Sequence, residues 1–213
     1  MKVKAVLFDM DGVLIDSMPY HFISWFETLK HYGIRVTPTD IYAREGEKWI
    51  KSVTEFFAMG NQPLTKKRMR EVFNMRDKIF KKFFTPFLFE GAEDLVKLLK
   101  NKGYLIAIVT GSGSKEAKRM LPKSLYECFD TVVGGDMVKH GKPHPEPYLI
   151  AAKKLKVKPS ECLVIENAPY GIKSAKAAKM CCFAVQTSLP HKYLKEADKV
   201  FPSIAKVYSY FNS

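Results

Sequence analysis

Cysteine and long apolar runs are both scarce in this sequence. Four of its 213 residues are cysteines, namely Cys128, Cys162, Cys181 and Cys182. They form no Cys-x-x-Cys pair and no cluster with histidine at zinc spacing, which excludes a zinc finger and a disulfide framework. We therefore expect all four to be small buried apolar residues in a reducing compartment.

No stretch reaches the roughly 18 apolar residues of a membrane-spanning helix. The first apolar run, from Val3 to Phe8, is too short for the core of a signal peptide, and carboxylates follow it directly. The sequence thus favours a cytoplasmic protein that does not enter a membrane.

Acidic residues are fewer than basic ones. The sequence contains 22 aspartates and glutamates and 35 lysines and arginines, which gives a formal net charge of +13. This excess indicates an anionic partner, for which nucleic acid, a membrane surface and a phosphorylated metabolite are candidates. The lysines are scattered, and a solvated helix face explains the densest run, Lys66-Lys67-Arg68. No nucleic-acid-binding module is present. We therefore expect a monomer with a small phosphorylated substrate, and neither nucleic acid nor a membrane as partner.

Short apolar runs alternate with helical patterns along most of the chain. The expected strands are residues 3–8, 104–109, 131–133, 162–165 and 181–185. The expected helices among them are residues 95–100, 146–154 and 172–179. Such alternation predicts an α/β fold, a doubly wound parallel sheet with helices on both faces.

An all-helical stretch interrupts this alternation between the first two expected strands. Helical patterns cover residues 19–33, 48–59 and 65–84. We predict that residues 17–87 form a helical cap domain. It would be inserted into an α/β core domain of residues 1–16 and 88–213.

Polar side chains stand at or just beyond the ends of several expected strands. They are Asp9 and Asp11, then Thr110, then Lys142, and finally Glu166 with Asn167. Ligands bind outside the carboxyl ends of the strands in an open parallel sheet. One cleft would then collect carboxylates, a hydroxyl and an ammonium group.

This set of groups suits a phosphoryl group and a magnesium ion. Asp9 and Asp11 face the same way on an extended chain, so a cation between them would relieve their repulsion. Lys142 offers a point charge for phosphate, and the turn Gly111-Ser112 offers backbone N–H groups. Phosphoryl transfer depends mainly on positioning and charge neutralisation, so we predict this chemistry, with Mg²⁺ as cofactor.

Four motifs resemble those of the haloacid dehalogenase superfamily, in the same order along the chain. They are Asp9-Met10-Asp11-Gly12-Val13-Leu14, Val109-Thr110-Gly111-Ser112, Gly141-Lys142-Pro143-His144-Pro145-Glu146-Pro147-Tyr148 and Ile165-Glu166-Asn167-Ala168-Pro169-Tyr170-Gly171-Ile172. The helical insert after the first motif is similar to that of the β-phosphoglucomutase-like phosphatases. The resemblance implies a Rossmann-like core with a helical cap.

The resemblance also implies a role for each motif residue. Asp9 would be the nucleophile and a metal ligand. Asp11 would be the general acid and base, with its backbone carbonyl on the metal. Thr110 would bind the phosphoryl oxygens, and Lys142 would hold Asp9 and the phosphoryl group together. The fourth-motif pair, Glu166 and Asn167, would complete the magnesium site.

The implied reaction proceeds through an aspartyl phosphate. The expected activity is hydrolysis of a small phosphorylated metabolite or of inorganic pyrophosphate. The alternative is a phosphosugar mutase of the β-phosphoglucomutase type. A hydrolase admits water to the intermediate, whereas a mutase excludes it by closing the cap.

Several cap residues bear on this choice. Many relatives carry Glu-Asp where this chain has Glu166-Asn167, and Glu45 is a candidate to replace the missing charge or else an exposed residue without a role. Asparagine combined with a cap glutamate resembles a subgroup of inorganic pyrophosphatases. His21 resembles the hinge histidine of β-phosphoglucomutases, with a surface histidine as the alternative.

A mutase also needs a cap arginine for the second phosphate of its substrate. Trp49 takes that place in this chain, with Lys48 beside it as a candidate substrate contact. This substitution counts against a mutase.

Overall fold

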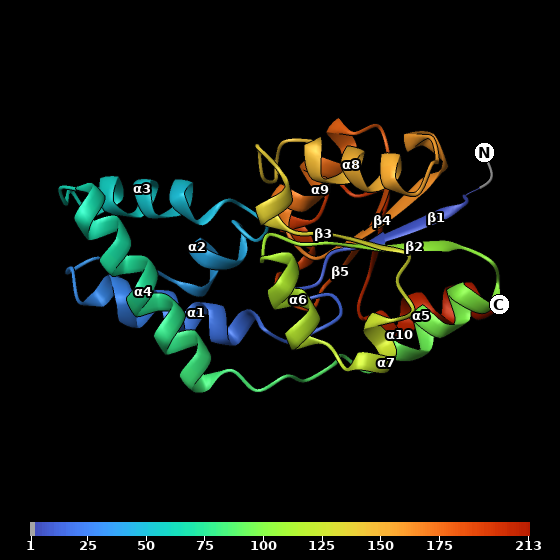
Figure 1. Cartoon of the computed structure of the whole chain (residues 1–213), viewed down its shortest axis with the longest axis horizontal. Helices are drawn as coiled ribbons and strands as arrows, with labels where there is room; N and C mark the ends of the chain where they lie inside the picture. The colour runs from blue at the N-terminus through green and yellow to red at the C-terminus, as the bar shows by residue number, and fades with distance from the viewer. Residues whose placement is uncertain (1–2) are drawn as a thin grey trace.

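A six-stranded sheet forms the centre of the molecule, for which a computed structural model describes residues 3–213. All neighbouring strands are parallel, in the order β3-β2-β1-β4-β5-β6 (Figure 1). The strands are β1 (Ala5–Phe8), β2 (Leu105–Val109), β3 (Thr131–Val133), β4 (Cys162–Glu166), β5 (Cys181–Val185) and β6 (Lys199–Phe201). The predicted fold class, a doubly wound α/β sheet with an inserted helical cap, is confirmed.

Both faces of the sheet are covered by helices, which explains the unbroken apolar run of β1. Val6 and Phe8 point into one core layer, and Ala5 and Leu7 point into the other. Helices α8 (Glu146–Lys154) and α9 (Pro169–Ala177) cover the second of these faces. The first is covered by α5 (Ala92–Asn101), α6 (Ser114–Met120), α7 (Lys123–Tyr126) and α10 (Ile204–Asn212).

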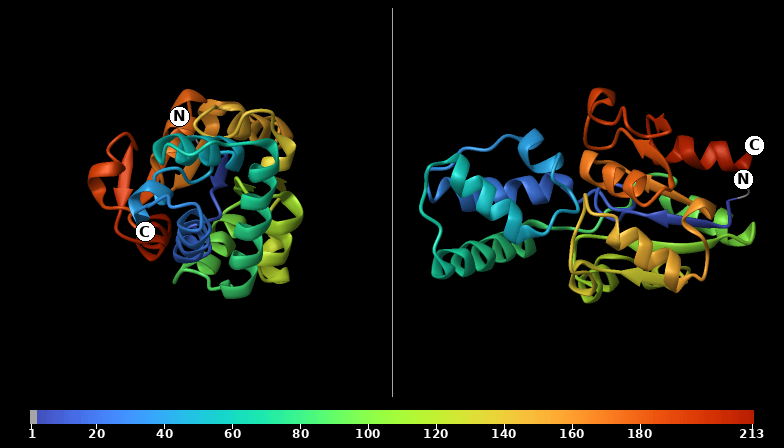
Figure 2. Two further views of the ribbon diagram at one scale, coloured as in Figure 1. Left: turned by 90° about the vertical axis from the view of Figure 1, so that its left-hand side faces the viewer. Right: turned by 90° about the horizontal axis from the view of Figure 1, so that it is seen from above.

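Four helices form a separate unit at one end of the sheet (Figures 1 and 2). They are α1 (Met18–Lys30), α2 (Pro38–Tyr42), α3 (Trp49–Met59) and α4 (Lys66–Phe83). They enclose a core of their own, which includes Trp25, Leu29 and Phe56. The chain enters this unit after β1 and returns beside its own entry, since Ile15 forms a bridge with Leu88. This arrangement supports our proposal that the cap spans residues 17–87.

Four α-helices and one strand of the described residues were not expected from the sequence: α2, α6, α7, α10 and β6. Two are helices of 4 and 5 residues, too short for a clear helical period. Strand β6 has 3 residues and lies at the sheet edge, where only its last residue is buried. Helix α10 packs against α5, a long-range contact that the local pattern does not reveal.

The expectation that all cysteines are buried is wrong for Cys181, which is exposed, and for Cys128, which is half-buried. Cys181 and Cys182 are consecutive on β5, so their side chains point to opposite faces and only Cys182 reaches the core. Among the helices of residues 3–213, none combines the length and apolarity that crossing a membrane requires.

Candidate active site

The loop after β1 presents the two first-motif aspartates, Asp9 and Asp11, and both are fully buried. Gly12 allows this loop to turn, because its φ of 82° is costly for residues with a side chain. A Cβ at this position would lie 2.0 Å from Nδ2 of Asn167. The glycine therefore also allows the first and fourth motifs to approach each other.

Lys142 is the ammonium group at the centre of the site, and only 2% of the residue is exposed. Its Nζ donates to Oδ1 of Asp9 at 2.5 Å and to Oε1 of Glu166 at 2.7 Å. It also donates to the backbone carbonyl of Val109 at 3.1 Å, at the end of β2. Burial alone would lower the pKa of Lys142, but the two carboxylates outweigh it and raise the pKa above its ordinary value. The lysine is therefore a fixed positive charge.

Asp9 holds one oxygen against this lysine and keeps the other free. Its Oδ2 is buried and has no hydrogen-bond partner within residues 3–213. Burial raises the pKa of Asp9 well above its ordinary value, although Lys142 opposes this effect. A buried carboxylate oxygen without a partner is costly, so a ligand or cation is expected on Oδ2.

Asp11 is held differently, because both of its oxygens accept hydrogen bonds. Ser17 Oγ donates to Oδ1 at 2.7 Å, and His21 Nε2 lies 3.2 Å from the same oxygen. Thr110 Oγ1 and Ser112 Oγ donate to Oδ2 at 3.1 and 3.3 Å. Burial acts to raise the pKa of Asp11, but the bonds from His21, Ser17 and Thr110 prevail and lower it to about 2. Asp11 is therefore ionised in this arrangement.

Glu166 uses both carboxylate oxygens within the protein. Oε1 accepts from Lys142 and from the Tyr148 hydroxyl at 2.9 Å, and Oε2 accepts from the backbone N–H groups of Asn167 and Ala168 at 2.8 and 3.2 Å. A Cβ on Gly171 would lie 1.6 Å from Oε1, so this position of the carboxylate depends on glycine. Here Glu166 mainly positions Lys142.

Asn167 is oriented by Ser188, whose Oγ accepts from Nδ2 at 2.9 Å. This leaves Oδ1 of Asn167 buried without a partner among the described residues. Asp9 Oδ2 and Asn167 Oδ1 are thus two buried, unpartnered oxygens from predicted metal ligands. Oxygen donors of this kind fit Mg²⁺. Within residues 3–213, no group of three or more His, Cys, Asp or Glu side chains is arranged to hold a metal ion by itself.

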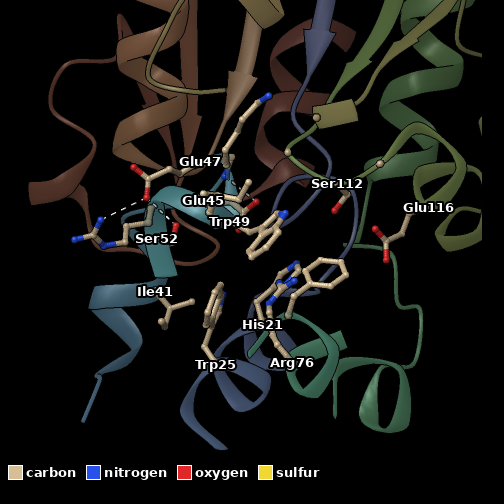
Figure 3. A pocket seen from close by; sticks show the side chains of 18 of the residues that line it. His21, Trp25, Ile41, Glu45, Glu47, Trp49, Ser52, Arg76, Ser112 and Glu116 are labelled. Atoms are coloured by element: carbon tan, nitrogen blue, oxygen red, sulfur yellow. Dashed lines mark hydrogen bonds and ion pairs between the residues drawn. The ribbon is translucent and has the colours of Figure 1, made fainter. Parts of the chain in front are cut away.

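A cavity of about 430 Å³ lies between the cap and the core beside this site, and its lining includes His21 and Ser112, which both contact Asp11. Figure 3 shows its walls, with His21, Trp25 and Arg76 from the helices of the cap and Ser112 and Glu116 from the core. The cap loop, which we define as residues 43–48, closes one side. A Cβ on Gly46 of this loop would lie 2.3 Å from Cδ of Lys142, and one on Gly111 would lie 3.0 Å from Cα of Gly46. Cap and core are therefore in direct contact at the site.

The cap residues predicted from the sequence all reach this region. His21 contacts Asp11, and Glu45 lines the cavity with its Oε1 accepting from the Gly46 N–H at 2.9 Å. Lys48 also lines the cavity, with Nζ on the Val138 carbonyl at 2.7 Å. Glu45 is thus partly buried and faces the site.

Sequence reasoning missed four residues whose side chains form hydrogen bonds with the predicted site residues. They are Ser17, Arg76, Tyr148 and Ser188. Tyr148 lies in the third motif and Ser17 follows shortly after the first, so their closeness to motif residues could have marked them as site residues. Arg76 and Ser188 are distant from every motif, and no local pattern marks them.

The fold and the four assembled motifs define the class of this protein. A sequence profile described as haloacid dehalogenase-like hydrolase matches residues 3–179. The chain belongs to the haloacid dehalogenase-like hydrolases.

Individual relatives place it further within the family. Fructose-1-phosphate phosphatase YqaB from Escherichia coli (strain K12) is 32% identical over 84% of this chain and 94% of YqaB. Protein SUPPRESSOR OF QUENCHING 1, chloroplastic, from Arabidopsis thaliana is 36% identical over 92% of this chain, which spans only 19% of that protein. A Clostridium perfringens relative, provisionally named pyrophosphatase PpaX, is 32% identical over 93% of this chain and 92% of its own length.

Among solved structures, β-phosphoglucomutase from Clostridium difficile is similar with a TM-score of 0.84 and 25% identity. The likeness covers 99% of this chain and 97% of that one. These matches confirm the predicted superfamily, its branch of β-phosphoglucomutase-like phosphatases, and the class of enzyme.

Proposed function

We propose that this protein is a magnesium-dependent phosphohydrolase that acts on a small phosphorylated metabolite through an aspartyl phosphate on Asp9. The observation that carries this proposal is the asymmetric environment of Asp9. One carboxylate oxygen is fixed by Lys142, while the other is buried without a partner among residues 3–213. Such an oxygen is placed for a phosphoryl group and a cation rather than for the stability of the fold.

The residues of the site supply the parts of a two-step reaction. The Asp9 carboxylate forms a bond to phosphorus while the bond from phosphorus to the leaving oxygen breaks, and Asp11 gives that oxygen its proton. Water then attacks the aspartyl phosphate, with Asp11 taking the proton, which regenerates Asp9 and releases phosphate. Lys142 neutralises negative charge on the transferring group. Magnesium would be held by the unpartnered oxygens of Asp9 and Asn167 together with the Asp11 backbone carbonyl, and it would add further charge neutralisation. Glu166, whose oxygens already accept hydrogen bonds, would support this site by positioning Lys142.

Asp11 must change its hydrogen bonds before the first step. In the observed arrangement it is ionised and accepts from four side chains, so it has no proton to give. Two of these side chains, Ser17 and His21, lie at the start of the cap. We infer that movement of the cap releases Asp11 and lets it take up a proton.

A phosphosugar mutase is the second candidate. The contact between His21 and Asp11 and the likeness to the Clostridium difficile β-phosphoglucomutase favour it. Trp49 opposes it, because this residue stands where a mutase needs an arginine for the second phosphate. Conversion of β-glucose 1-phosphate to glucose 6-phosphate without phosphate release would favour the mutase.

The direct test is phosphate release from a panel of sugar phosphates, nucleotides and pyrophosphate with Mg²⁺. We expect strong release from at least one monoester. Asp9→Asn should lower turnover by roughly 10⁴-fold or more, since an amide cannot form the covalent intermediate. Circular dichroism should show that the variant is folded. A folded Asn variant with undiminished turnover would refute the covalent route.

A further inference from the structure

A second cavity, of about 630 Å³, lies where the start of α3 meets the loop that carries the third motif. Its walls are formed by residues 47, 48, 50 and 51 of the cap and by residues 139–145 of the core, and we call it the third-motif groove. His21, Arg76 and Ser112, which line the cavity beside Asp11, do not line this one. The groove is therefore a separate surface at the boundary between cap and core.

Basic side chains predominate in the lining of the third-motif groove. Five lining residues carry them: Lys48 and Lys51 from the cap, and Lys139, His140 and His144 from the core. Among the residues that the structure describes, Glu47 contributes the only carboxylate of this lining. A cleft lined mainly by groups of one sign concentrates ions of the opposite sign, so the groove attracts anions.

The carboxylate of Glu47 is already compensated by other cap residues. Its Oε1 lies 2.8 Å from Nζ of Lys51, and its Oε2 accepts from the Ser52 hydroxyl at 2.7 Å and lies 3.4 Å from Nη1 of Arg44. Only 1% of the Glu47 side chain is exposed. This carboxylate therefore does little to repel an anion from the groove.

The basic side chains on the core side remain available to a ligand. Lys139 and His140 are exposed, and within residues 3–213 neither side chain has a carboxylate at ion-pair distance. Their backbone N–H groups donate to the Glu146 carboxylate at 2.6 and 3.0 Å, which fixes this part of the loop. Nδ1 of His144 accepts from the Glu146 N–H at 3.2 Å, so the hydrogen of this ring is on Nε2, which can donate to a ligand.

Lys48 already connects the two walls of the groove. Its Nζ, on the cap, donates to the backbone carbonyl of Val138 in the core at 2.7 Å. A carbonyl carries no net charge, so the ammonium group of Lys48 keeps its attraction for an anion. Lys142 also lines the groove, but its Nζ is occupied by Asp9 and Glu166. An anion in the groove would thus interact with lysines of the cap and with basic residues of the core at the same time.

An anion with more than one charged group fits this arrangement best. Basic side chains stand on both walls, so the ligand needs acceptors directed to each, and two linked phosphoryl groups provide them. An uncharged polyol would leave the ammonium groups without charge compensation, and a cation would be repelled. The volume of about 630 Å³ is that of a site for a small molecule.

We propose that the third-motif groove is a regulatory site for a small polyanion with two or more phosphoryl groups, which holds the cap against the core. Opening of the cap would separate Lys48 and Lys51 from Lys139 and His140, so the ligand binds the closed arrangement more tightly. It therefore opposes the cap movement that releases Asp11. This effect on turnover rests on the proposed function, whereas binding in the groove does not.

Calorimetric titration with methylenediphosphonate tests the binding site. Its P–C–P bridge resists hydrolysis, and metal-free buffer of low ionic strength leaves no cation at Asp9 and Asp11 to attract it. We expect Kd to rise by about threefold or more in Lys139→Gln and in His140→Gln. Lys153→Gln is the control, because this exposed lysine of α8 lies outside the groove. No binding to the native protein, or the same Kd in all four proteins, would overturn the proposal.

Hydrogen exchange tests whether the bound anion holds the cap. Exchange of the backbone amides of the cap loop should slow when methylenediphosphonate binds the native protein, and should slow less at the same ligand concentration in Lys139→Gln. Unchanged exchange in the saturated native protein would overturn the effect on the cap.

Steady-state kinetics at saturating free Mg²⁺ test the effect on turnover. With the best substrate of the phosphate-release panel, methylenediphosphonate should lower kcat by about threefold or more, and Lys139→Gln should relieve this inhibition. A rise in KM alone, equal in the native protein and in Lys139→Gln, would place the ligand at Asp9 and overturn the regulatory role. If no substrate released phosphate, the proposed function would fail, while the titration and the exchange data would still decide this inference.

Discussion

At the scale of single residues, Asp9 and Asp11 are held in different ways although they lie two positions apart. Asp9 has one oxygen on Lys142 and one without a partner. Asp11 has both oxygens occupied by hydroxyl and imidazole groups. The environment of Asp9 is suited to a carboxylate that reacts. The environment of Asp11 stabilises the ionised form of its carboxylate.

The second environment predicts a pH dependence of stability. Burial acts to raise the pKa of Asp11, but the hydrogen bonds prevail and lower it from 3.8 to about 2. The ionised Asp11 therefore adds to the free energy of unfolding above pH 4, and this stabilisation is lost as the pH falls through about 2. The difference corresponds to about 2 kcal/mol of unfolding free energy. Ser17→Ala removes one donor and should therefore be less stable than the native protein at neutral pH.

The difference in unfolding free energy between the native protein and Ser17→Ala should become smaller as the pH falls from about 4 to about 2. Urea unfolding at a series of pH values measures it. Ser209→Ala is the control, because Ser209 donates only to the backbone carbonyl of Ala205. A difference in unfolding free energy that stays constant over this pH range would show that the hydrogen bond from Ser17 does not stabilise the ionised form of Asp11.

Asn167 leads to a prediction about metal affinity. Ser188 orients its amide so that Oδ1 is free, and Asn167→Asp would add a negative charge at that oxygen. Mg²⁺ should then bind more tightly, whereas Ser188→Ala should weaken binding by about tenfold through loss of orientation. Protection against thermal unfolding as a function of Mg²⁺ concentration measures both effects. Asn101→Asp, an exposed change of equal charge, is the control, and identical Mg²⁺ curves for all four proteins would remove Asn167 from the metal site.

At the scale of elements, the cap loop determines how closely the cap approaches the core. Gly46 has a φ of 78° and leaves room for the side chain of Lys142. Gly111 in turn leaves room for Gly46. Two glycines on opposite sides of the contact allow the backbones to meet beside the reacting groups.

Gly46→Ala should therefore damage activity more than stability. The alanine would meet Cδ of Lys142 at 2.3 Å, so the loop must move away from the core. We expect kcat/KM to fall by roughly 10²-fold, because small misplacements near the reacting groups are costly. Steady-state kinetics and thermal unfolding measure the two effects.

Gly33→Ala is the matched control for this change. Gly33 has a similar φ of 73°, but a Cβ there would meet nothing within 4 Å. Both substitutions should lower the free energy of unfolding by about 1 kcal/mol, because a positive φ is unfavourable for alanine. If Gly33→Ala lowered activity as much as Gly46→Ala, the contact with Lys142 would not be the cause.

At the scale of the whole molecule, a strongly basic chain surrounds a cavity that both acidic and basic side chains line. A net charge of +13 attracts anionic substrates over distances of about a Debye length. The groups expected to react, Asp9 and Lys142, are buried inside the protein. Attraction of the substrate and the chemical step thus depend on different sets of residues.

This separation predicts a salt effect confined to association. For the best monophosphate, kcat/KM should fall several-fold between about 10 mM and about 300 mM salt, as screening shortens the Debye length. The kcat value at saturating substrate should change little, because Lys142 and Asp9 are buried away from the ions. Stopped-flow or steady-state kinetics at constant Mg²⁺ activity would test this. A kcat that falls in parallel with kcat/KM would contradict it.

Most of the fold was predictable because its determinants are local. The apolar run of β1 and the turn residues after it define a buried strand and the place where ligands bind. The boundaries of the long helices also followed from their periodicity, as in α4, where Thr65 caps the helix through a hydrogen bond from the Arg68 N–H. The short helices α2 and α7 carry too few residues for such a pattern, and α10 depends on its packing against α5.

The sequence by itself determined the reacting groups, since Asp9, Asp11, Lys142 and Glu166 belong to motifs whose residue types suit phosphoryl chemistry. Only the tertiary structure decided the surroundings of those groups. Arg76 reaches His21 across 55 positions of sequence, and Ser188 reaches Asn167 from the loop after β5. Free carboxylates such as Glu116 are distinguishable from paired ones only when every neighbour is placed. Charge compensation depends on distances in space, and no local pattern of residues contains them.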